Sequence, residues 1–185
     1  MNNKQLYILR GLPSSGKTEV ADLLAHNCDD VATHSIEDYF YNPKTQEYTF
    51  KLEELSNAYA DCLAKTEQSL QDKEINVVVV HNIFATAYEC KPYFDLAEKH
   101  NASVRILSMF DSGMHDGQLE ELNINGWRKG AIQSKRKAWE LNVYPHRQNK
   151  RPRNNQKNSD LSNQMIVLPY EALANLNRSL NKRRR

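Results

Sequence analysis

The sequence predicts an α/β protein with a three-layer αβα sandwich, in which helices cover both faces of a central parallel sheet. Apolar runs of strand length alternate with amphipathic stretches of helix length over residues 5–110. The strand-length runs are apolar throughout and do not alternate with polar residues, which is typical of parallel strands buried on both faces. A glycine-bounded loop joins the first run to the first amphipathic stretch. The chain has 185 residues, which is enough for one domain with a substantial core.

The glycine-bounded loop reads GLPSSGKT and matches the G-x-x-x-x-G-K-[ST] pattern of a P-loop. Glycines at both ends let successive backbone N–H groups turn inward around a phosphate, and the following helix adds the positive end of its dipole. In such loops the lysine reaches the β- and γ-phosphates, and the threonine holds Mg²⁺. The pattern predicts a P-loop NTPase fold in which Thr18 is the metal ligand. The expected binding residues for ATP are Gly11, Pro13, Ser14, Ser15, Gly16, Lys17 and Thr18.

The remaining elements are predicted from apolar periodicity and turn residues. Strands are expected at residues 5–10, 31–35, 75–80, 103–110 and 165–168. Helices are expected at residues 16–27, 51–71, 88–100, 118–123, 129–141 and 169–180. The apolar stripe of the second helix begins at Leu52, and residues 42–48 form a polar loop. Pro92 either lies in the first turn of the third helix or marks its true start. We expect a kinase-like domain over residues 1–141 and a basic linker and tail over 142–185.

Two adjacent acids, Glu37 and Asp38, follow the strand at 31–35, at the edge where open α/β sheets bind ligands. Phosphoryl transfer requires in-line positioning, charge neutralisation and often a carboxylate that accepts the hydroxyl proton. One acid of the pair fits that catalytic role, and the other fits the orientation of Mg²⁺-bound water. The alternative is that both are capping and surface acids of a short helix.

His81 and Asn82 follow the strand at 75–80 and reach the same edge. We predict that both bind substrate. Asn82 is placed to hydrogen-bond substrate or water near the γ-phosphate, whereas His81 is either a phosphate contact or a strand-end residue. No acid ends this strand. That absence points away from motor-type ATPases and toward small kinases.

A small helical lid is expected after the strand at 103–110, where two short helices flank a glycine-containing segment. Mobile lids in small kinases bring an arginine onto the transferring phosphoryl group. Arg128 is the first candidate for this catalytic role. Trp127 and Trp139 fit lid or core packing, with base stacking as the alternative. The other basic candidates lie one helix later, at Lys135, Arg136 and Lys137.

The net charge of +2 hides an asymmetry between the two parts of the chain. Residues 1–140 carry 15 Lys and Arg against 21 Asp and Glu, a balance of −6. Residues 141–185 carry 10 basic and two acidic residues, a balance of +8. A basic tail on an acidic body suggests contact with nucleic acid. A solvated tail without a ligand is the alternative.

Cysteine usage and hydropathy bear on the compartment. The three cysteines are widely spaced and form no C-x-x-C pair, which is typical of a reducing cytoplasm and argues against a zinc site. The N-terminus is polar and leads directly into the first strand, so no secretory signal is expected. No stretch approaches the roughly 20 apolar residues of a membrane span. We expect a soluble cytoplasmic protein.

Taken together, these motifs resemble the polynucleotide-kinase-like P-loop proteins. That group includes the kinase domain of phage polynucleotide kinase and phage enzymes that phosphorylate hydroxymethylated bases in DNA. The resemblance rests on the P-loop, on SIEDYF at 35–40, and on VVVHNIF at 78–84 followed by KPY and LA. Residues 123–140 look like the lid and closing helix of that family. The resemblance covers about residues 4–140, and its most specific motif is the P-loop.

The resemblance implies phosphate binding by Gly11 to Thr18 and acceptor activation at Glu37, which occupies the catalytic aspartate position of the family. The chain departs from the family pattern at three further positions. His81 stands where an acid is usual, Phe84 where an Asn follows, and Phe40 where polynucleotide kinase has an arginine. These departures leave the acceptor, and full activity, open.

Three functional hypotheses follow. The first is an ATP-dependent kinase that phosphorylates a hydroxyl on a nucleic acid (a 5′-hydroxyl or a hydroxymethylated base) or on a nucleotide. The second is a kinase for a small metabolite or a nucleoside, and a zeta-toxin-like kinase for an amino-sugar nucleotide shares this architecture. The third is an ATP-binding module without transfer activity, with a regulatory or nucleic-acid-binding role.

Overall fold

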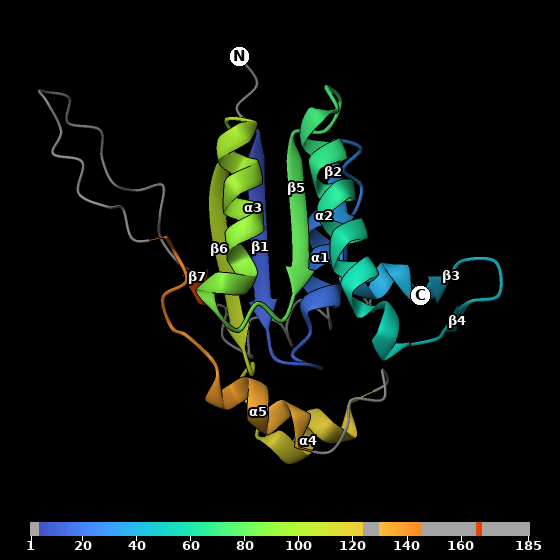
Figure 1. Cartoon of the computed structure of the whole chain (residues 1–185), viewed down its shortest axis with the longest axis vertical. Helices are drawn as coiled ribbons and strands as arrows, with labels where there is room; N and C mark the ends of the chain where they lie inside the picture. Colours follow the sequence, from blue (N-terminus) through green and yellow to red (C-terminus); the bar gives the residue numbers. More distant parts are fainter. Residues whose placement is uncertain (1–3, 124–129, 146–165, 168–185) are drawn as a thin grey trace, which may run out of the picture.

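The computed structural model describes residues 4–123, 130–145 and 166–167. Its centre is a five-stranded parallel sheet with the strand order β2-β5-β1-β6-β7, which confirms the predicted α/β class (Figure 1). Because the strands are parallel, their carboxyl ends meet at one edge of the sheet. The strands are β1 (Gln5–Gly11), β2 (Val31–His34), β5 (Val77–Asn82), β6 (Ser103–Phe110) and β7 (Ile166–Val167).

Helices cover both faces of this sheet. In Figure 1, α1 (Lys17–Ala25) lies behind the sheet, and α2 (Leu55–Gln71) and α3 (Ala87–Lys99) lie in front of it. Two short helices, α4 (Asp116–Glu121) and α5 (Ala131–Lys137), lie below the carboxyl edge, where the sequence predicts a small helical lid. The predicted three-layer sandwich is therefore the observed architecture.

The central strand β1 is buried on both faces because its side chains alternate between two cores. Leu6 and Ile8 pack with residues of α2 and α3, whereas Leu9 packs with Val20 and Ala21 of α1. All five side chains are 5% exposed or less. Burial of each aliphatic side chain of this size contributes about 1.5–3 kcal/mol. This double packing fixes β1, and so fixes the loop that follows it.

The structure corrects two expectations about the second predicted helix and the loop before it. Leu52 is 61% exposed and belongs to a 3₁₀ turn, η2 (Leu52–Glu54), so it does not begin the buried stripe. The buried face of the helix is formed instead by four residues spaced four apart: Ala58, Cys62, Thr66 and Leu70. The polar loop at 42–48 contains a two-stranded antiparallel hairpin, β3 (Tyr41–Asn42) and β4 (Glu47–Tyr48).

Two further boundaries differ from the prediction. Strand β5 runs on to Asn82, so the two polar residues expected after it are part of the strand. Helix α3 begins at Ala87 because Thr86 caps it, with its side chain accepting a hydrogen bond from the Glu89 N–H. Pro92 therefore lies in the second turn of α3 and not in the first. Its missing N–H leaves the carbonyl four residues earlier without the usual helical donor.

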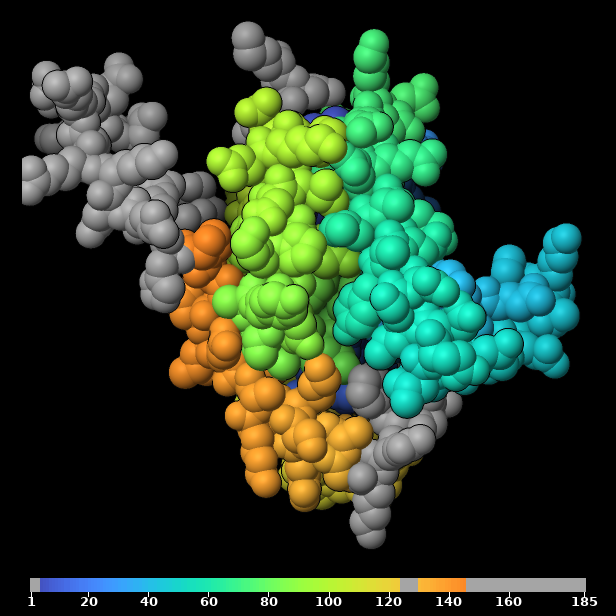
Figure 2. Space-filling model, viewed as in Figure 1, coloured from blue at the N-terminus to red at the C-terminus, as the bar shows by residue number. Residues whose placement is uncertain are grey.

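The packed chain continues past residue 141, where the sequence predicts a linker. Val143 is 1% exposed and belongs to the core beside α3, and the Tyr144 ring lies 5.9 Å from the Phe94 ring. Figure 2 shows this segment, in orange, lying against the lower end of α3. The short strand expected at 165–168 is confirmed by β7, whereas the expected helix at 169–180 lies outside the described residues. Within the part of the chain that the structure describes, none of the helices has the length and apolarity to cross a membrane.

Candidate active site

The P-loop connects β1 to α1 at the carboxyl edge of the sheet. Its backbone takes left-handed angles at Ser14 (φ 63°) and Gly16 (φ 87°). Two hydrogen bonds tie the loop to the end of β6. The Leu12 N–H donates to the Phe110 carbonyl at 2.7 Å, and the Ser112 hydroxyl donates to the Ser15 carbonyl at 2.7 Å. The segment at the end of β6 therefore holds the loop at two points, Leu12 and Ser15.

The interior of the loop fits a phosphate group. A Cβ on Gly11 would lie 2.3 Å from the Ser15 hydroxyl, so only glycine leaves this space open. The Ser15 hydroxyl is buried and lacks a hydrogen-bond partner within the described residues. The N–H groups in the first turn of α1 have no partner within the helix and carry its positive dipole end. Together these groups supply the hydrogen-bond donors that a phosphate oxygen requires.

Lys17 begins α1 and turns back over the loop. Its Nζ donates a hydrogen bond to the Leu12 carbonyl at 2.8 Å. Burial lowers the pKa of this ammonium group to about 8, while the negative charges of Glu37 and Glu19 oppose the decrease. A partly buried lysine of this kind gains a stronger partner when a phosphate takes the place of the carbonyl. Thr18 is exposed in the same turn.

A prediction follows for Gly16, whose φ of 87° penalises any side chain by about 1–2 kcal/mol. Gly130, at the start of α5, has a φ of 81° and open space where a Cβ would lie, so it is a matched control. We expect Gly16→Ala and Gly130→Ala to lower the melting temperature similarly, but only Gly16→Ala to weaken ATP binding. Calorimetric titration with ATP, together with thermal unfolding, checks this. Equal ATP affinities in the two variants would contradict it.

The adjacent acids lie on a 3₁₀ turn, η1 (Ile36–Tyr39), and the structure distinguishes their surroundings. The Asp38 carboxylate accepts a hydrogen bond from the Ser35 N–H at 2.8 Å and closes a capping box. Burial raises the pKa of Asp38, and the Ser35 bond partly opposes that increase. Glu37, in contrast, is coupled electrostatically to Lys17. The two acids therefore differ in surroundings: Asp38 is used in the capping box, whereas the charge of Glu37 acts on Lys17.

Asn82 connects β5 to the turn that carries the acids. Its side-chain oxygen accepts a hydrogen bond from the Ile36 N–H at 2.9 Å, and its amide nitrogen lies 3.7 Å from the Cys62 sulfur. Asn82 is 5% exposed. These contacts support the position of η1, whereas the sequence predicts a substrate contact for this residue.

His81 lies in β5 in register with Leu9 of β1, one strand from the P-loop. Its side chain is 7% exposed. Burial, together with the charge of Lys17, lowers the pKa of His81 to about 4. The imidazole is therefore neutral near pH 7 and does not add a second cation beside Lys17.

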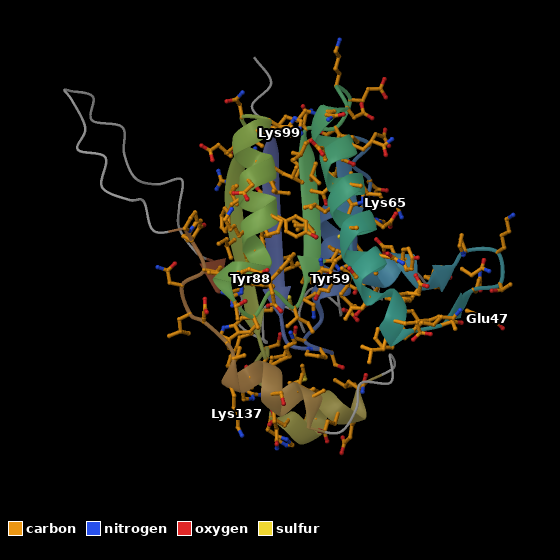
Figure 3. The ribbon with its side chains drawn as sticks, in the orientation of Figure 1. Glu47, Tyr59, Lys65, Tyr88, Lys99 and Lys137 are labelled. Atoms are coloured by element: carbon orange, nitrogen blue, oxygen red, sulfur yellow. The ribbon has the colours of Figure 1, made fainter. Side chains whose placement is uncertain are left out.

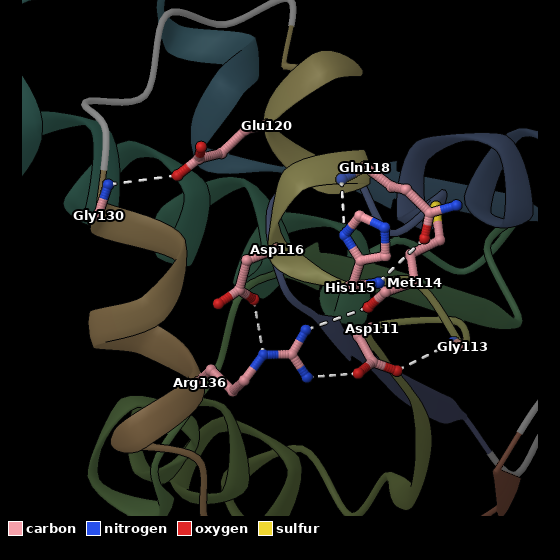
Figure 4. Close-up of polar contacts among 9 residues, drawn as sticks. All are labelled: Asp111, Gly113, Met114, His115, Asp116, Gln118, Glu120, Gly130 and Arg136. Carbon is pink, nitrogen blue, oxygen red and sulfur yellow. Dashed lines mark hydrogen bonds and ion pairs between the residues drawn. The ribbon is translucent and has the colours of Figure 1, made fainter.

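Arg136 fastens the lid to the end of β6 (Figure 4). Its guanidinium pairs with Asp111 and, at 2.7 Å, with Asp116, and it also donates to the Met114 carbonyl at 3.1 Å. The guanidinium of Arg136 therefore makes its hydrogen bonds and ion pairs with residues between the end of β6 and α4. Of the alternative lid residues, Arg136 thus has a packing role in this conformation. Arg128, the first candidate, lies outside the described residues.

A buried arginine beneath the P-loop is a feature that the sequence analysis missed. Arg10 is 0% exposed, and its guanidinium donates to the carbonyls of Ala85 at 3.1 Å and Glu140 at 2.9 Å. The guanidinium carbon lies 3.9 Å from the centre of the Trp139 ring. Arg10 therefore joins β1 to the loop before α3 and to the segment after α5. The sequence does contain a sign of this role, because Arg10 is a charged residue at the end of the apolar run that leads into the P-loop.

The fold and the loop define an α/β protein with a P-loop at the carboxyl edge of its parallel sheet. No family model matches the chain. NEDD4-binding protein 2 of Homo sapiens is 32% identical over 99 residues, which cover 54% of this chain and 5% of the length of that relative. This chain therefore matches only about a twentieth of that curated relative.

Two solved structures are similar to this chain at low sequence identity. Kti12 of Chaetomium thermophilum, solved in complex with ADP-AlF3, is 13% identical with a TM-score of 0.50, and the match covers 73% of this chain and 80% of that one. A sugar kinase of Janibacter sp. HTCC2649, solved without ligand, is 14% identical with a TM-score of 0.49, over 97% of this chain and 93% of that one.

Proposed function

We propose that this protein is an ATP-dependent kinase that transfers the γ-phosphoryl group to a hydroxyl on a nucleic acid or a nucleotide. The observation that carries the proposal is the interior of the P-loop, which contains the buried Ser15 hydroxyl, without a partner among the described residues, and the Lys17 side chain, with Glu37 on the neighbouring η1 turn. A phosphate-binding cation and a carboxylate at one sheet edge are the two charges that phosphoryl transfer to an alcohol requires.

Each residue has a defined part in the proposed reaction. The P-loop N–H groups and Lys17 hold the β- and γ-phosphates. Thr18 would hold Mg²⁺, whose positive charge would offset that of the phosphates. Glu37 accepts the proton of the acceptor hydroxyl while the oxygen of that hydroxyl bonds to the γ-phosphorus. The bond from that phosphorus to the β-bridging oxygen breaks, and ADP leaves. Asn82 holds the turn that orients Glu37.

A nucleic-acid or nucleotide acceptor is proposed on two grounds. The motifs at 35–40 and 78–84 resemble those of polynucleotide-kinase-like proteins. In addition, residues 141–185 carry a balance of +8, which raises the local concentration of a polyanion and makes its binding dependent on salt.

The test uses the full chain with γ-labelled ATP and Mg²⁺. The acceptors are 5′-hydroxyl DNA and RNA, DNA with hydroxymethylated bases, free nucleosides and a blank without acceptor. We expect label on one nucleic-acid or nucleotide acceptor, with none for Lys17→Ala or Glu37→Gln. Label on nucleosides alone would favour the small-molecule kinase. Tight ATP binding with no labelled acceptor would replace the proposal with an ATP-binding module.

A further prediction concerns Asn82, which holds η1 through the Ile36 N–H. Asn82→Leu removes that acceptor and leaves a part-buried N–H unpaired, at a cost of about 1–3 kcal/mol. We expect a lower melting temperature, a lower kcat and an unchanged ATP affinity.

The matched control for Asn82 is Thr66→Val. Thr66 is buried on α2, and its hydroxyl donates to the Cys62 carbonyl at 2.8 Å, a bond made within α2. Thr66→Val should lower the melting temperature but leave kcat near its original value. If both variants lose stability and keep the same kcat, Asn82 has no role in placing Glu37.

A further inference from the structure

Arg10 is a buried cation that the proposed reaction does not use. It is the last residue before the P-loop, and alternation along β1 places its side chain on the same face of the sheet as Leu6 and Ile8. The side chain is fully buried, yet its Nε and Nη1 have no hydrogen-bond partner within the part of the chain that the structure describes. Burying a charge is costly unless other contacts compensate for the lost water. The contacts that do hold Arg10 therefore indicate its role.

Two of these contacts join the residue before the P-loop to the segment after α5. The guanidinium donates to the Glu140 carbonyl at 2.9 Å, and its carbon lies 3.9 Å from the centre of the Trp139 ring. A cation at this distance is attracted by the aromatic face. The same segment is tied to the loop before α3, because the Glu140 N–H donates to the Ala85 carbonyl at 2.8 Å and Arg10 donates to that carbonyl as well. Arg10 thus fixes where the chain leaves α5.

The Trp139 ring in turn contacts the end of β6. Its centre lies 4.9 Å from that of the Phe110 ring, and the guanidinium carbon of Arg136 lies 5.0 Å from the Phe110 ring. Arg136, on α5, also pairs with Asp116 of α4 (Figure 4). Two cations and two rings therefore form a continuous series of contacts from β1 to both lid helices. We call this series, Arg10, Trp139, Phe110 and Arg136, the Arg10 stack.

The lid helices also pack directly on the P-loop. Leu12, within the loop, is fully buried in a cluster with Leu119 of α4 and Ile132 of α5. Figure 3 shows Lys137 on the outer side of α5, away from the sheet. The Lys17 Nζ donates its hydrogen bond to the carbonyl of this same Leu12. A phosphate that draws Lys17 from that carbonyl therefore acts on the residue against which the lid packs.

We propose that Arg10 is a positioning residue that holds the lid helices α4 and α5 on the P-loop, so that a nucleotide phosphate bound in the loop and the lid respond to each other. The inference goes beyond the proposed kinase function, because it requires a nucleotide at the P-loop but no transfer of its phosphoryl group. Binding of the nucleotide then changes the surroundings of Trp139, and the lid contributes to the affinity for the nucleotide. Both effects depend on the Arg10 side chain.

The test uses Trp139 as a fluorescent probe. The chain has two tryptophans, so every protein in the test carries Trp127→Phe, and the one without a further change is the reference protein. Trp139 emission is followed while the full chain is titrated with the non-hydrolysable β,γ-imido analogue of ATP and Mg²⁺, and calorimetry gives the affinity.

The variants separate the contacts of Arg10 from its contribution to stability. Arg10→Met keeps a long apolar stem but removes the cation and its donors, whereas Arg10→Lys keeps the cation and loses the planar group. The matched control is Leu70→Ala, because Leu70 is 3% exposed in the core and takes no part in the Arg10 stack. Circular dichroism shows which variants are folded, and Arg10→Lys takes the place of Arg10→Met if the latter is not.

We expect the analogue to change Trp139 emission in the reference protein, with its midpoint at the calorimetric affinity. Arg10→Met should lose this change and bind the analogue at least about fivefold more weakly, the lower end of the usual coupling between linked sites. Arg10→Lys should lie between these two proteins. Leu70→Ala should keep both the emission change and the affinity despite a lower melting temperature.

Three results overturn the inference. The first is binding of the analogue to the reference protein with no change in Trp139 emission, a result that requires no substitution at Arg10. The second is a folded Arg10→Met protein that keeps both the emission change and the affinity. The third is an equal loss of both in Arg10→Met and Leu70→Ala, which assigns Arg10 to stability alone.

Labelled ATP and the acceptor series, applied to the same proteins, separate the two proposals. An emission change that depends on Arg10, without label on any acceptor, leaves the coupling and removes the kinase. Label transfer with the same kcat and the same KM for ATP in Arg10→Met removes the coupling and leaves the kinase. A reference protein that does not bind the analogue overturns both.

Discussion

Replacing Lys17 with alanine is expected to lower the rate of phosphoryl transfer by about 10²–10³-fold, the usual effect of removing one preorganised donor to a developing charge. The substitution also removes the hydrogen bond from Nζ to the Leu12 carbonyl, which holds the side chain over the loop. The label-transfer rate with the accepted hydroxyl measures the effect. A variant within about tenfold of the original rate would exclude Lys17 from the reaction.

The pH dependence of ATP binding gives an independent test of Lys17. Its pKa is lowered to about 8, so the unliganded side chain loses its charge as the pH rises through that value. A phosphate needs the ammonium form, so ATP affinity should be full below about pH 7 and fall by up to about tenfold per unit above about pH 8. Lys17→Ala should bind weakly and without this decrease. A similar decrease in the variant would assign the titration to another group.

Glu37→Gln is expected to lower kcat by about 10²–10⁴-fold, the range that a positioned general base contributes. ATP affinity should be kept or improved, because the change removes a negative charge near the phosphates. Single-turnover transfer and calorimetric ATP titration measure the two effects. Parallel loss of ATP affinity and kcat would instead make Glu37 a residue that shapes the loop.

Asp38→Asn is the matched control for Glu37→Gln, since it neutralises the neighbouring acid. Asp38 accepts a hydrogen bond from the Ser35 N–H in the capping box, and the side-chain oxygen of asparagine can still accept that bond. We therefore expect a melting temperature close to the original, with most of kcat retained. A loss of kcat as large as that of Glu37→Gln would mean that the two acids share the catalytic role.

The central fold was predictable because its signals are local. Continuous runs of β-branched residues such as Val77–Val80 predict buried parallel strands, and the loop motif fixes which strand ends at the phosphate site. The sheet and its flanking helices follow from this alternation. The sequence also placed Lys17 and Glu37 at the same edge of the sheet, because the carboxyl ends of parallel strands must meet there.

Other features depend on contacts between distant residues and were not predictable. The role of Asn82 is defined by a hydrogen bond to Ile36, 46 residues away, which no local pattern encodes. The hairpin at 41–48 was mistaken for a polar loop because its strands are two residues long, too short for an alternating pattern. Leu52 was misplaced because helical periodicity continued into a 3₁₀ turn that precedes the helix.

The buried Arg10 also bears on the order in which the protein folds. One of its two carbonyl partners, Glu140, lies 130 positions further along the chain. Contacts of such long range form late, because the entropy of closing a large loop must be offset first. The strand that presents the phosphate loop therefore completes its surroundings only after the segment beyond the lid has been synthesised and has docked. Assembly of the nucleotide site is thus coupled to completion of the lid.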